Sequence, residues 1–273
     1  MSKIRLLRNA DLPQLLELSR HADWNQTQAD WERMLQHAAC WGMDVDGEIV
    51  SSTTGIVYPH NLAWIGMVLT HPEHRGRGHA TALMKHAVDE LRGRVDWLKL
   101  DATDLGRPIY EKLGFELESH LQRWQRPAGP VAKLSSYLVH DYAVDPSFDR
   151  AYFGAYRIPL LNALRRDGDS RFVVGYGYAM TRRGAQATYF GPCVVRTLEA
   201  ARALLENAIE SHQNEPMFWD LFAANKDAVK LAREYGFQPV RHLTRMALRC
   251  SPDALPILRN ESSVFAIAGF EYG

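Results

Sequence analysis

One stretch in the first half of the chain, residues 62–91, constrains the fold more than any other. Its first part, residues 62–70, is almost entirely apolar, as expected of a strand that is covered on both faces. A turn containing Gly76 and Gly78 follows. Beyond the turn, apolar residues recur at helical spacing and form one stripe: Ala80, Leu83, Met84, Ala87, Val88 and Leu91. The stretch predicts a buried strand, a glycine-rich turn and a helix.

The turn has the chemistry of an anion site. Gly76 and Gly78 lack the Cβ atom that would keep a ligand away from the backbone. The N–H groups of a first helical turn have no partner within the helix, and the helix dipole adds positive charge beside them. Arg75 and Arg77 add two full charges. The pattern favours a cradle for phosphate or pyrophosphate, although a tight strand-to-helix connection would also account for the glycines.

Two common nucleotide-binding motifs fit this turn less well. A phosphate-binding loop needs a lysine followed by serine or threonine, and the dinucleotide fingerprint needs a third glycine where this chain has Thr81. The match is instead to Arg-x-x-Gly-x-Ala at Arg75, Gly78 and Ala80. Here the sequence resembles the GCN5-related N-acetyltransferase (GNAT) superfamily, whose signature is Gln/Arg-x-x-Gly-x-Gly/Ala. The resemblance implies that this turn binds the pyrophosphate of acetyl-CoA.

A second motif supports the resemblance. Residues 97–102 predict a strand and residues 104–113 a helix. The motif Tyr110-Glu-Lys-Leu-Gly114-Phe115 closes this unit. Tyr-x-x-x-Gly-Phe after a strand and a short helix is similar to the other motif of the family. The two motifs follow each other in the family's order, so the resemblance covers about residues 1–126.

The resemblance implies a set of functional residues. The end of the central strand would carry the pantetheine of acetyl-CoA along its backbone, and an N–H near Val68 would polarise the thioester carbonyl. Tyr110 would be the acid that protonates the departing thiolate. Thr103 stands where the family often has an asparagine that contacts CoA. The implied cofactor-binding residues are Val68, Leu69, Thr70, Arg75, Gly76, Arg77, Gly78, His79, Ala80, Thr81 and Thr103.

The acceptor site and the base are less defined. Trp24, Asn25 and Gln26 lie between two predicted helices, where the resembled fold roofs the acceptor pocket. The same residues could instead fill the core and cap a turn. Proximity to strand ends leaves three candidates for the base open: Asp101, His60 and His71. A water chain would also serve.

Two further patterns concern the start of the first helix and a cluster of histidines. Asp11 and Gln14, with Pro13 between them, have the pattern of a capping pair at a helix start. Four histidines crowd the glycine-rich turn: His71, His74, His79 and His86. No carboxylate or cysteine completes a ligand set around them, so solvated side chains are favoured over a metal site, and we expect no metal.

The second half of the chain repeats the first in a degenerate form. Both halves predict strand, helix, strand, helix, Gly-Phe and strand, which indicates a tandem fold. However, 17 positions separate Gly66 from Leu83, whereas only 13 separate Gly191 from Leu204, so the glycine-rich turn is missing from the second half. Ala232 replaces the motif tyrosine there. The second half therefore looks non-catalytic.

These observations give the predicted organisation. We expect a mixed α/β fold of two tandem GNAT-like domains, each with a mixed, mostly antiparallel sheet flanked by helices. Residues 1–126 would form the catalytic, acetyl-CoA-binding domain, and residues 131–273 the degenerate domain. The boundary follows from the linker composition of residues 126–130, Arg-Pro-Ala-Gly-Pro.

Composition narrows the class of function. The 32 basic and 32 acidic residues balance, so the net charge gives no reason to expect nucleic acid or an anionic membrane as a partner. No run approaches the ~20 apolar residues of a membrane span. Three scattered cysteines fit neither a disulfide scaffold nor a zinc site, which suggests a reduced, cytoplasmic setting. We expect the chain to act as a monomer or homodimer.

The sequence thus favours an enzyme that moves an acetyl group from acetyl-CoA to a primary amine of a small molecule, such as an amino acid or amino sugar. The alternative of another class is a non-catalytic acyl-CoA-binding or regulatory module. Turnover of acetyl-CoA with any amine would separate the two.

Overall fold

The structure is a computed structural model that describes residues 2–59, 61–132, 135–141, 145–257 and 260–273. The chain divides into two compact units. Unit 1 consists of residues 1–118, 246–255 and 271–273, and unit 2 of residues 119–245 and 256–270. Each unit thus takes chain from both halves of the sequence, and the sequence-based domain boundaries near residues 126 and 131 remain a proposal.

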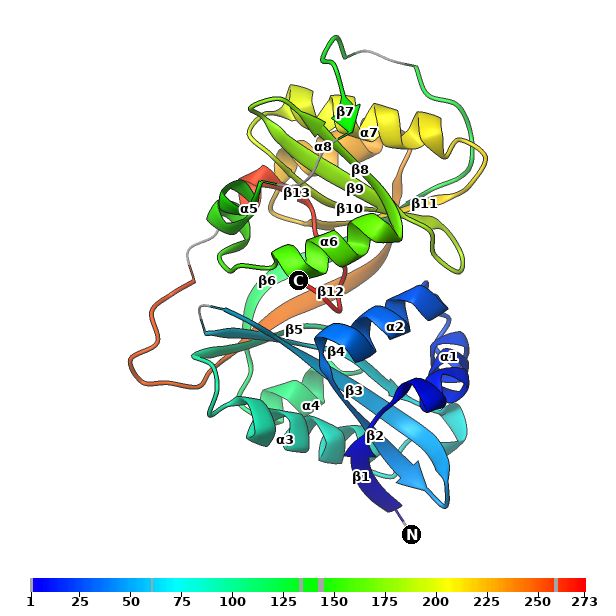
Figure 1. The fold of residues 1–273 in the computed structure, drawn as a ribbon, viewed down its shortest axis with the longest axis vertical. Helices are drawn as coiled ribbons and strands as arrows, with labels where there is room; N and C mark the ends of the chain where they lie inside the picture. The colour runs from blue at the N-terminus through cyan, green and yellow to red at the C-terminus, as the bar shows by residue number, and fades with distance from the viewer. Residues whose placement is uncertain (1, 60, 133–134, 142–144, 258–259) are drawn as a thin grey trace. The chain divides into compact units, whose positions relative to one another are not determined.

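Unit 1 is built on a mixed sheet, as predicted. Strands β1 (Ser2–Leu6), β2 (Ala39–Val45), β3 (Glu48–Tyr58) and β4 (Leu62–Thr70) pair antiparallel in this order, and β5 (Trp97–Ala102) pairs parallel to β4. Figure 1 shows helices α1 (Leu12–His21) and α2 (Gln28–His37) on one face of this sheet, and α3 (His79–Leu91) and α4 (Arg107–Lys112) on the other.

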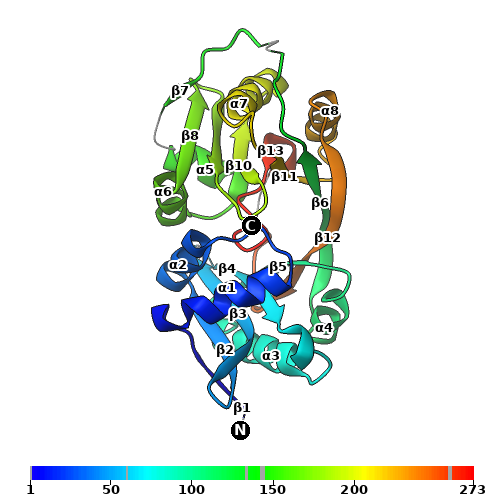
Figure 2. The same ribbon diagram turned by 90° about the vertical axis from the view of Figure 1, so that its right-hand side faces the viewer.

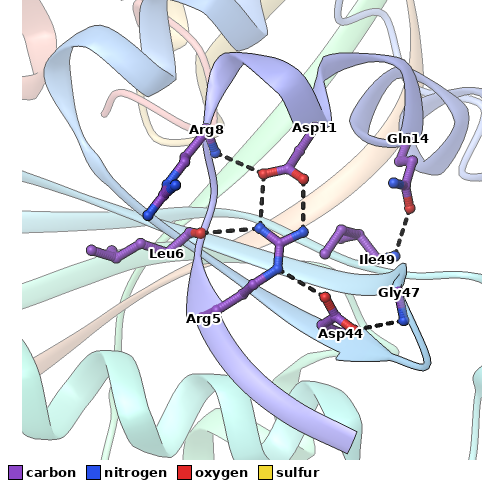
Figure 3. A network of polar contacts seen from close by, with 8 residues as sticks. All are labelled: Arg5, Leu6, Arg8, Asp11, Gln14, Asp44, Gly47 and Ile49. Carbon is purple, nitrogen blue, oxygen red and sulfur yellow. Dashed lines mark hydrogen bonds and ion pairs between the residues drawn. The ribbon is translucent and has the colours of Figure 1, made fainter.

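The first helix of unit 1, α1, starts directly after Asp11 with Pro13 in its first turn, as predicted, but no side chain caps it. Asp11 lies in the short 3-10 helix η1 (Asn9–Asp11), and its carboxylate accepts from both Nη atoms of Arg5, at 2.7 and 2.9 Å (Figure 3). Arg5 also donates from Nε to Asp44 at 2.9 Å. Gln14 accepts from the backbone N–H of Ile49 at 2.7 Å. The predicted Asp11–Gln14 capping pair is therefore wrong, because Asp11 bonds to Arg5 and to the N–H of Arg8, and Gln14 bonds to β3.

The core of unit 1 lies between the sheet and α3. Leu83, Met84, Ala87 and Leu91 of α3 are fully buried, as the helical stripe predicted. They pack against Trp41, Val50, Ala63, Ile65, Leu98 and Leu100 of the strands. Full burial of each leucine stabilises the fold by about 1.5–3 kcal/mol, so this contact fixes where α3 begins relative to the end of β4.

Unit 2 repeats the mixed sheet. Its strands follow the order β6 (Glu116–Arg126), β11 (Met217–Phe222), β10 (Thr188–Val195), β9 (Gly177–Arg182), β8 (Gly168–Val173) and β7 (His140–Asp141). A further strand, β13 (Val264–Ala266), pairs with β10 and follows the 3-10 helix η3 (Glu261–Ser263). The helices of the unit are α5 (Pro146–Phe153), α6 (Ile158–Arg166), α7 (Leu198–Ser211) and α8 (Lys226–Glu234).

The strands that follow the two Gly-Phe motifs are exchanged between the halves of the sequence. In unit 2, β6 pairs antiparallel with β11 from Leu121↔Phe222 to Arg126↔Met217. Strand β12 (Gln238–Arg249) runs beside β6 (Figure 2). Its last residues, from Met246 on, belong to unit 1, where they lie next to β5. Each sheet is therefore completed by a strand from the other half of the sequence.

In the part of the chain that the structure describes, no helix is both long and apolar enough to cross a membrane.

Candidate active site

The end of β4 departs from a regular strand. Met67 has a φ of 50°, and the register between β3 and β4 shifts between Ser52 and Thr54. The hydroxyl of Ser52 donates to the Met67 carbonyl at 2.8 Å and holds this bulge. Parallel pairing with β5 covers only Leu62–Trp64 against Trp97–Lys99. Beyond it the two strands no longer pair, so the backbone of residues 65–70 on that side lies outside the β4–β5 ladder.

The glycine-rich turn has the geometry of an anion cradle. Gly76 and Gly78 have φ angles of 75° and 79°, and Gly78 is the N-cap of α3. A Cβ atom built on either glycine meets no atom within 4 Å, which leaves room for a ligand against the backbone. The first helical bond of α3 is donated by Ala82 to Gly78, so the N–H groups of residues 79–81 lie outside the helical ladder.

The turn also carries charged side chains. Arg75 and Arg77 are exposed, and Nε of Arg75 donates to the Thr70 carbonyl at 3.3 Å. Burial, followed by the nearby charges of His74 and Arg77, lowers the pKa of His79 below its ordinary value. His79 is therefore neutral at pH 7, and the arginines supply the positive charge of the turn. These features fit the pyrophosphate of acetyl-CoA.

The histidines of the region contact one another and neighbouring protein groups. His71, at the end of β4, lies with Nε2 3.1 Å from Nε2 of His21. Its Nδ1 accepts from the N–H of Glu73 at 3.4 Å. His86 packs edge-on against Trp41. Among the described residues, no group of three or more histidine, cysteine or acidic side chains could hold a metal ion.

Tyr110 lies on α4 within the core of unit 1. Its ring is buried and packs edge-on against Phe115, with ring centroids 6.3 Å apart. A Cβ atom built on Gly106 would lie 3.1 Å from the Tyr110 hydroxyl, so the phenol lies directly over the start of α4. Burial raises the pKa of Tyr110. Thr103 shapes the preceding turn, because its Oγ1 accepts from the N–H of Gly106 at 3.2 Å.

The predicted acceptor residues lie in the connection from α1 to α2. Asn25 is buried, and Trp24 and Gln26 are half-buried. The N–H of Trp24 donates to the Ser19 carbonyl at 3.1 Å. His21, at the end of α1, joins this connection to the end of β4 through His71. Of the three candidate bases, Asp101 is half-buried on β5, and His60 lies outside the described residues.

In unit 2, the equivalent of the β4–β5 separation is filled by the chain itself. Parallel pairing of β10 with β11 ends at Phe190↔Trp219. Strand β13 then pairs with β10 at Cys193 and Val194. On its other side, the N–H of Ile267 donates to the Asp220 carbonyl of β11 at 3.0 Å. A peptide segment thus lies between the two strands of unit 2.

Other features of unit 2 agree with a lost cofactor site. Helix α7 starts directly after β10, with Thr197 as its N-cap and no glycine in the turn. Ala232, in place of the motif tyrosine, is fully buried. The Nδ2 of Asn225 donates hydrogen bonds to the carbonyls of Glu261, Ser262 and Val264, each at 3.1 Å. The asparagine therefore holds the segment that leads into β13.

The sequence reasoning missed the last three residues of this chain. Residues 271–273 belong to unit 1 and lie against β4. A Cβ atom built on Gly66 would lie 2.8 Å from Cα of Glu271, and one built on Gly273 would lie 2.8 Å from the Trp64 ring. Gly66, alone within a strand pattern, was the only sequence signal, since such a glycine often marks a close approach of another backbone.

Comparison with known proteins identifies the family. Residues 4–115 match the acetyltransferase (GNAT) family, and residues 146–258 match an acetyltransferase (GNAT) domain. An acetyltransferase of Sodalis glossinidius is 30% identical over 128 residues, which cover 42% of this chain and 88% of that protein. The chain belongs to the GNAT family. It is an N-acetyltransferase with two GNAT domains in tandem, as the sequence motifs predicted.

Solved structures share the fold of this GNAT protein. A candidate acetyltransferase of Pyrococcus horikoshii has a TM-score of 0.87 at 21% identity, over 100% of this chain and 96% of that one. A tandem GNAT protein from the clavulanic acid biosynthesis pathway has a TM-score of 0.67 at 15% identity, over 93% and 100% of the two chains. At these identities the likeness extends to the fold alone.

Proposed function

We propose that this GNAT protein transfers the acetyl group of acetyl-CoA to a primary amine of a small molecule, such as an amino acid or amino sugar. The observation that carries the proposal is the combination, in unit 1, of the β4–β5 separation with the open glycine turn at the start of α3. Other GNAT acetyltransferases use acetyl-CoA as donor. Bound acetyl-CoA supplies an activated acyl group as a thioester.

The residues of the turn would hold the donor. The N–H groups of residues 79–81, the glycines and the two arginines would bind the pyrophosphate, because they combine an open backbone with positive charge. The backbone of Val68, Leu69 and Thr70, which lies outside the β4–β5 ladder, would carry the pantetheine. Orientation of donor and acceptor in one site can lower the barrier by about 7–11 kcal/mol.

Tyr110 would protonate the leaving thiolate. Burial raises the pKa of its phenol, so it stays protonated at neutral pH and has a proton to give. A backbone N–H at the Met67 bulge, near Val68, would stabilise the developing oxyanion. The acceptor amine would approach the connection that holds Trp24, Asn25 and Gln26.

One donor site per chain is expected. In unit 2, β13 lies between β10 and β11, and the glycine turn is missing, so we expect neither pantetheine nor pyrophosphate to bind there. Titration calorimetry with acetyl-CoA should therefore give a stoichiometry of one. Two equivalent sites would contradict the assignment of unit 2.

A thiol-release screen tests the function. Acetyl-CoA is offered with amino acids, polyamines, aminoglycosides and short peptides, and released CoA is measured. We expect turnover with at least one amine, and Tyr110→Phe should lower kcat by about 100-fold or more while acetyl-CoA still binds. Tyr156→Phe, on a partly exposed tyrosine of unit 2, is the matched control. No release with any amine, despite tight binding, would favour a binding module.

A further inference from the structure

Strand β3 carries four consecutive hydroxyl side chains where it passes the bulge of β4. All four residues are fully buried: Ser51, Ser52, Thr53 and Thr54. A hydroxyl buried in a sheet costs free energy unless it makes a hydrogen bond, so apolar side chains would be expected at these positions. The hydroxyls of Ser51 and Ser52 both donate to carbonyls of β4. The two serines therefore act on the strand that is proposed to carry the donor.

The bulge brings an unusual backbone conformation to this part of β4. The register shift between Ser52 and Thr54 sets one residue of β3 opposite two residues of β4, Met67 and Val68. Met67 has a φ of 50°, a conformation that a residue other than glycine keeps only where surrounding contacts hold it. Val68 is half-buried, whereas residues 62–67 before it are all buried. The bulge thus lies where β4 first becomes partly exposed.

The Ser52 hydroxyl fixes the orientation of one peptide group in the bulge. It donates to the Met67 carbonyl at 2.8 Å. The Met67 carbonyl and the Val68 N–H belong to the same planar trans peptide, so they point in opposite directions. The Val68 N–H therefore points away from Ser52. Parallel pairing of β4 with β5 ends at Trp64, before the bulge, so this N–H lies outside the β4–β5 ladder.

Ser51 makes a similar contact beyond Val68. Its hydroxyl donates to the Leu69 carbonyl at 2.5 Å and lies 2.8 Å from the Thr70 hydroxyl. Because a hydroxyl has a single proton, Ser51 accepts the proton of Thr70. Two neighbouring serines of β3 thus hold the carbonyls of the residues on both sides of Val68.

We propose that Ser52 is a positioning residue that aims the Val68 N–H at the thioester carbonyl of the bound donor. This inference rests on the proposed function, in which a backbone N–H of the bulge stabilises the oxyanion. Ser52 acts through the peptide group between Met67 and Val68, and not by contact with the donor. An N–H that is fixed before the reaction stabilises the developing charge without having to reorient. The hydrogen bond to the carbonyl also polarises the peptide, which makes its N–H a stronger donor.

Ser52→Ala and Thr54→Val test this role as a matched pair. Both remove a fully buried hydroxyl of β3, but the Thr54 hydroxyl has no hydrogen-bond partner in the described part of the chain. With the best amine of the screen, Ser52→Ala should lower kcat by about 10-fold or more. Its dissociation constant for acetyl-CoA should change by less than about 3-fold, because the glycine turn is intact. Thr54→Val should change neither quantity. An unchanged kcat in Ser52→Ala, or an equal loss in both variants, would overturn the proposal.

The carbonyl stretch of bound acetyl-CoA, isotope-labelled at the thioester carbon, reports the same contact without turnover. A hydrogen bond from Val68 weakens the C=O bond and lowers its infrared frequency. We expect a higher frequency in Ser52→Ala than in the wild type, and no change in Thr54→Val. Equal frequencies in the wild type and Ser52→Ala would overturn the role of Ser52.

A second variant covers the case in which Ser52→Ala does not fold. Ser52→Cys keeps nearly the same size, but its thiol is a weak donor, so it should show the same fall in kcat and the same rise in frequency. Unfolding of both variants would make the contact a requirement of folding and would overturn the proposal.

The wild-type protein distinguishes this inference from the proposed function. If it does not bind acetyl-CoA, both fail. If it binds acetyl-CoA but turns over no amine, the proposed transfer fails, whereas the carbonyl stretch still decides the role of Ser52. If the wild type is active and Ser52→Ala is equally active, only the role of Ser52 is overturned.

Discussion

His71 and His21 are joined through their Nε2 atoms, 3.1 Å apart, and this contact links the end of β4 to the end of α1. The other ring nitrogen of His71 accepts from the N–H of Glu73. His21 in turn lies 3.0 Å from a carboxylate oxygen of Glu17. Both nitrogens of His71 are thus engaged in local contacts that shape the entry to the glycine turn.

This geometry predicts that His71 is not the base of the reaction. A base needs a lone pair directed at the substrate, and both nitrogens of His71 face protein groups. His71→Gln should therefore lower kcat/KM by less than about 10-fold, with the loss mainly in KM for acetyl-CoA because the adjoining turn shifts. Steady-state kinetics with the amine from the screen measure this. A kcat loss of about 100-fold or more in His71→Gln would instead assign the base to His71.

Local sequence patterns predicted the elements that lie close together along the chain. The strand, turn and helix of residues 62–91 formed as expected because apolar periodicity and glycine act within a few residues. The loss of the turn after β10 was equally visible, since Thr197 caps α7 directly. The roles proposed for the residues of the turn and for Tyr110 remain predictions.

Contacts between distant segments left little or no local signal. β13 pairs with β10 from about 70 positions away, and Glu271 approaches Gly66 from about 200. The exchange of β6 and β12 also depends on which strand edges meet in space. Asp11 shows the same limit at short range, because its carboxylate bonds to Arg5 and to the N–H of Arg8 instead of capping α1. Patterns along the chain predict the elements, whereas their pairing partners depend on the whole fold.

Gly106→Ala is expected to disturb catalysis more than folding. The added Cβ would lie 3.0–3.2 Å from Cε2, Cζ and the hydroxyl of Tyr110, so the ring must shift by a few tenths of an ångström. Gly106 has a φ of −82°, which alanine tolerates. We expect kcat to fall by about 10-fold, with acetyl-CoA affinity and Tm nearly unchanged. When Tyr110→Phe is already present, adding Gly106→Ala should lower kcat little further, because both substitutions act through the Tyr110 hydroxyl.

Gly78→Val should weaken both donor binding and folding. Position 78 has a φ of 79°, where a β-branched residue is strained by about 1–2 kcal/mol. The side chain would also fill the open space over the N–H groups of α3. Calorimetry should show an affinity for acetyl-CoA at least about 10-fold lower. Gly93→Ala, also open but without a positive φ, is the control and should change neither quantity. Unchanged affinity in Gly78→Val would make the turn a connector only.

The bond between Arg5 and Asp11 should make stability depend on pH in the acidic range. Arg5, followed by the N–H of Arg8, lowers the pKa of Asp11 below its ordinary 3.8. The carboxylate therefore stabilises the fold fully above about pH 3.8, and this contribution is lost as the pH falls through the lower folded value. Asp11→Asn should reduce the free energy of unfolding by about 2 kcal/mol at pH 7. Urea unfolding should show this difference shrinking towards zero below pH 3.8, whereas a difference constant across pH would contradict it.

Asn225→Ala should release the segment that leads into β13 without creating a second donor site. The buried Asn225 donates to three carbonyls and accepts from the N–H of Ala228 at the start of α8. Loss of these bonds leaves buried carbonyls unsatisfied and should destabilise unit 2 by about 2–3 kcal/mol. Hydrogen exchange should then rise at residues 264–267, and Asn207→Ala on α7, a half-buried position, should leave it unchanged. The stoichiometry of acetyl-CoA should stay at one per chain, because Thr197 still caps α7 where unit 1 has its glycine turn. A second bound acetyl-CoA in Asn225→Ala would mean that β13 alone, and not the missing turn, keeps the donor out of unit 2.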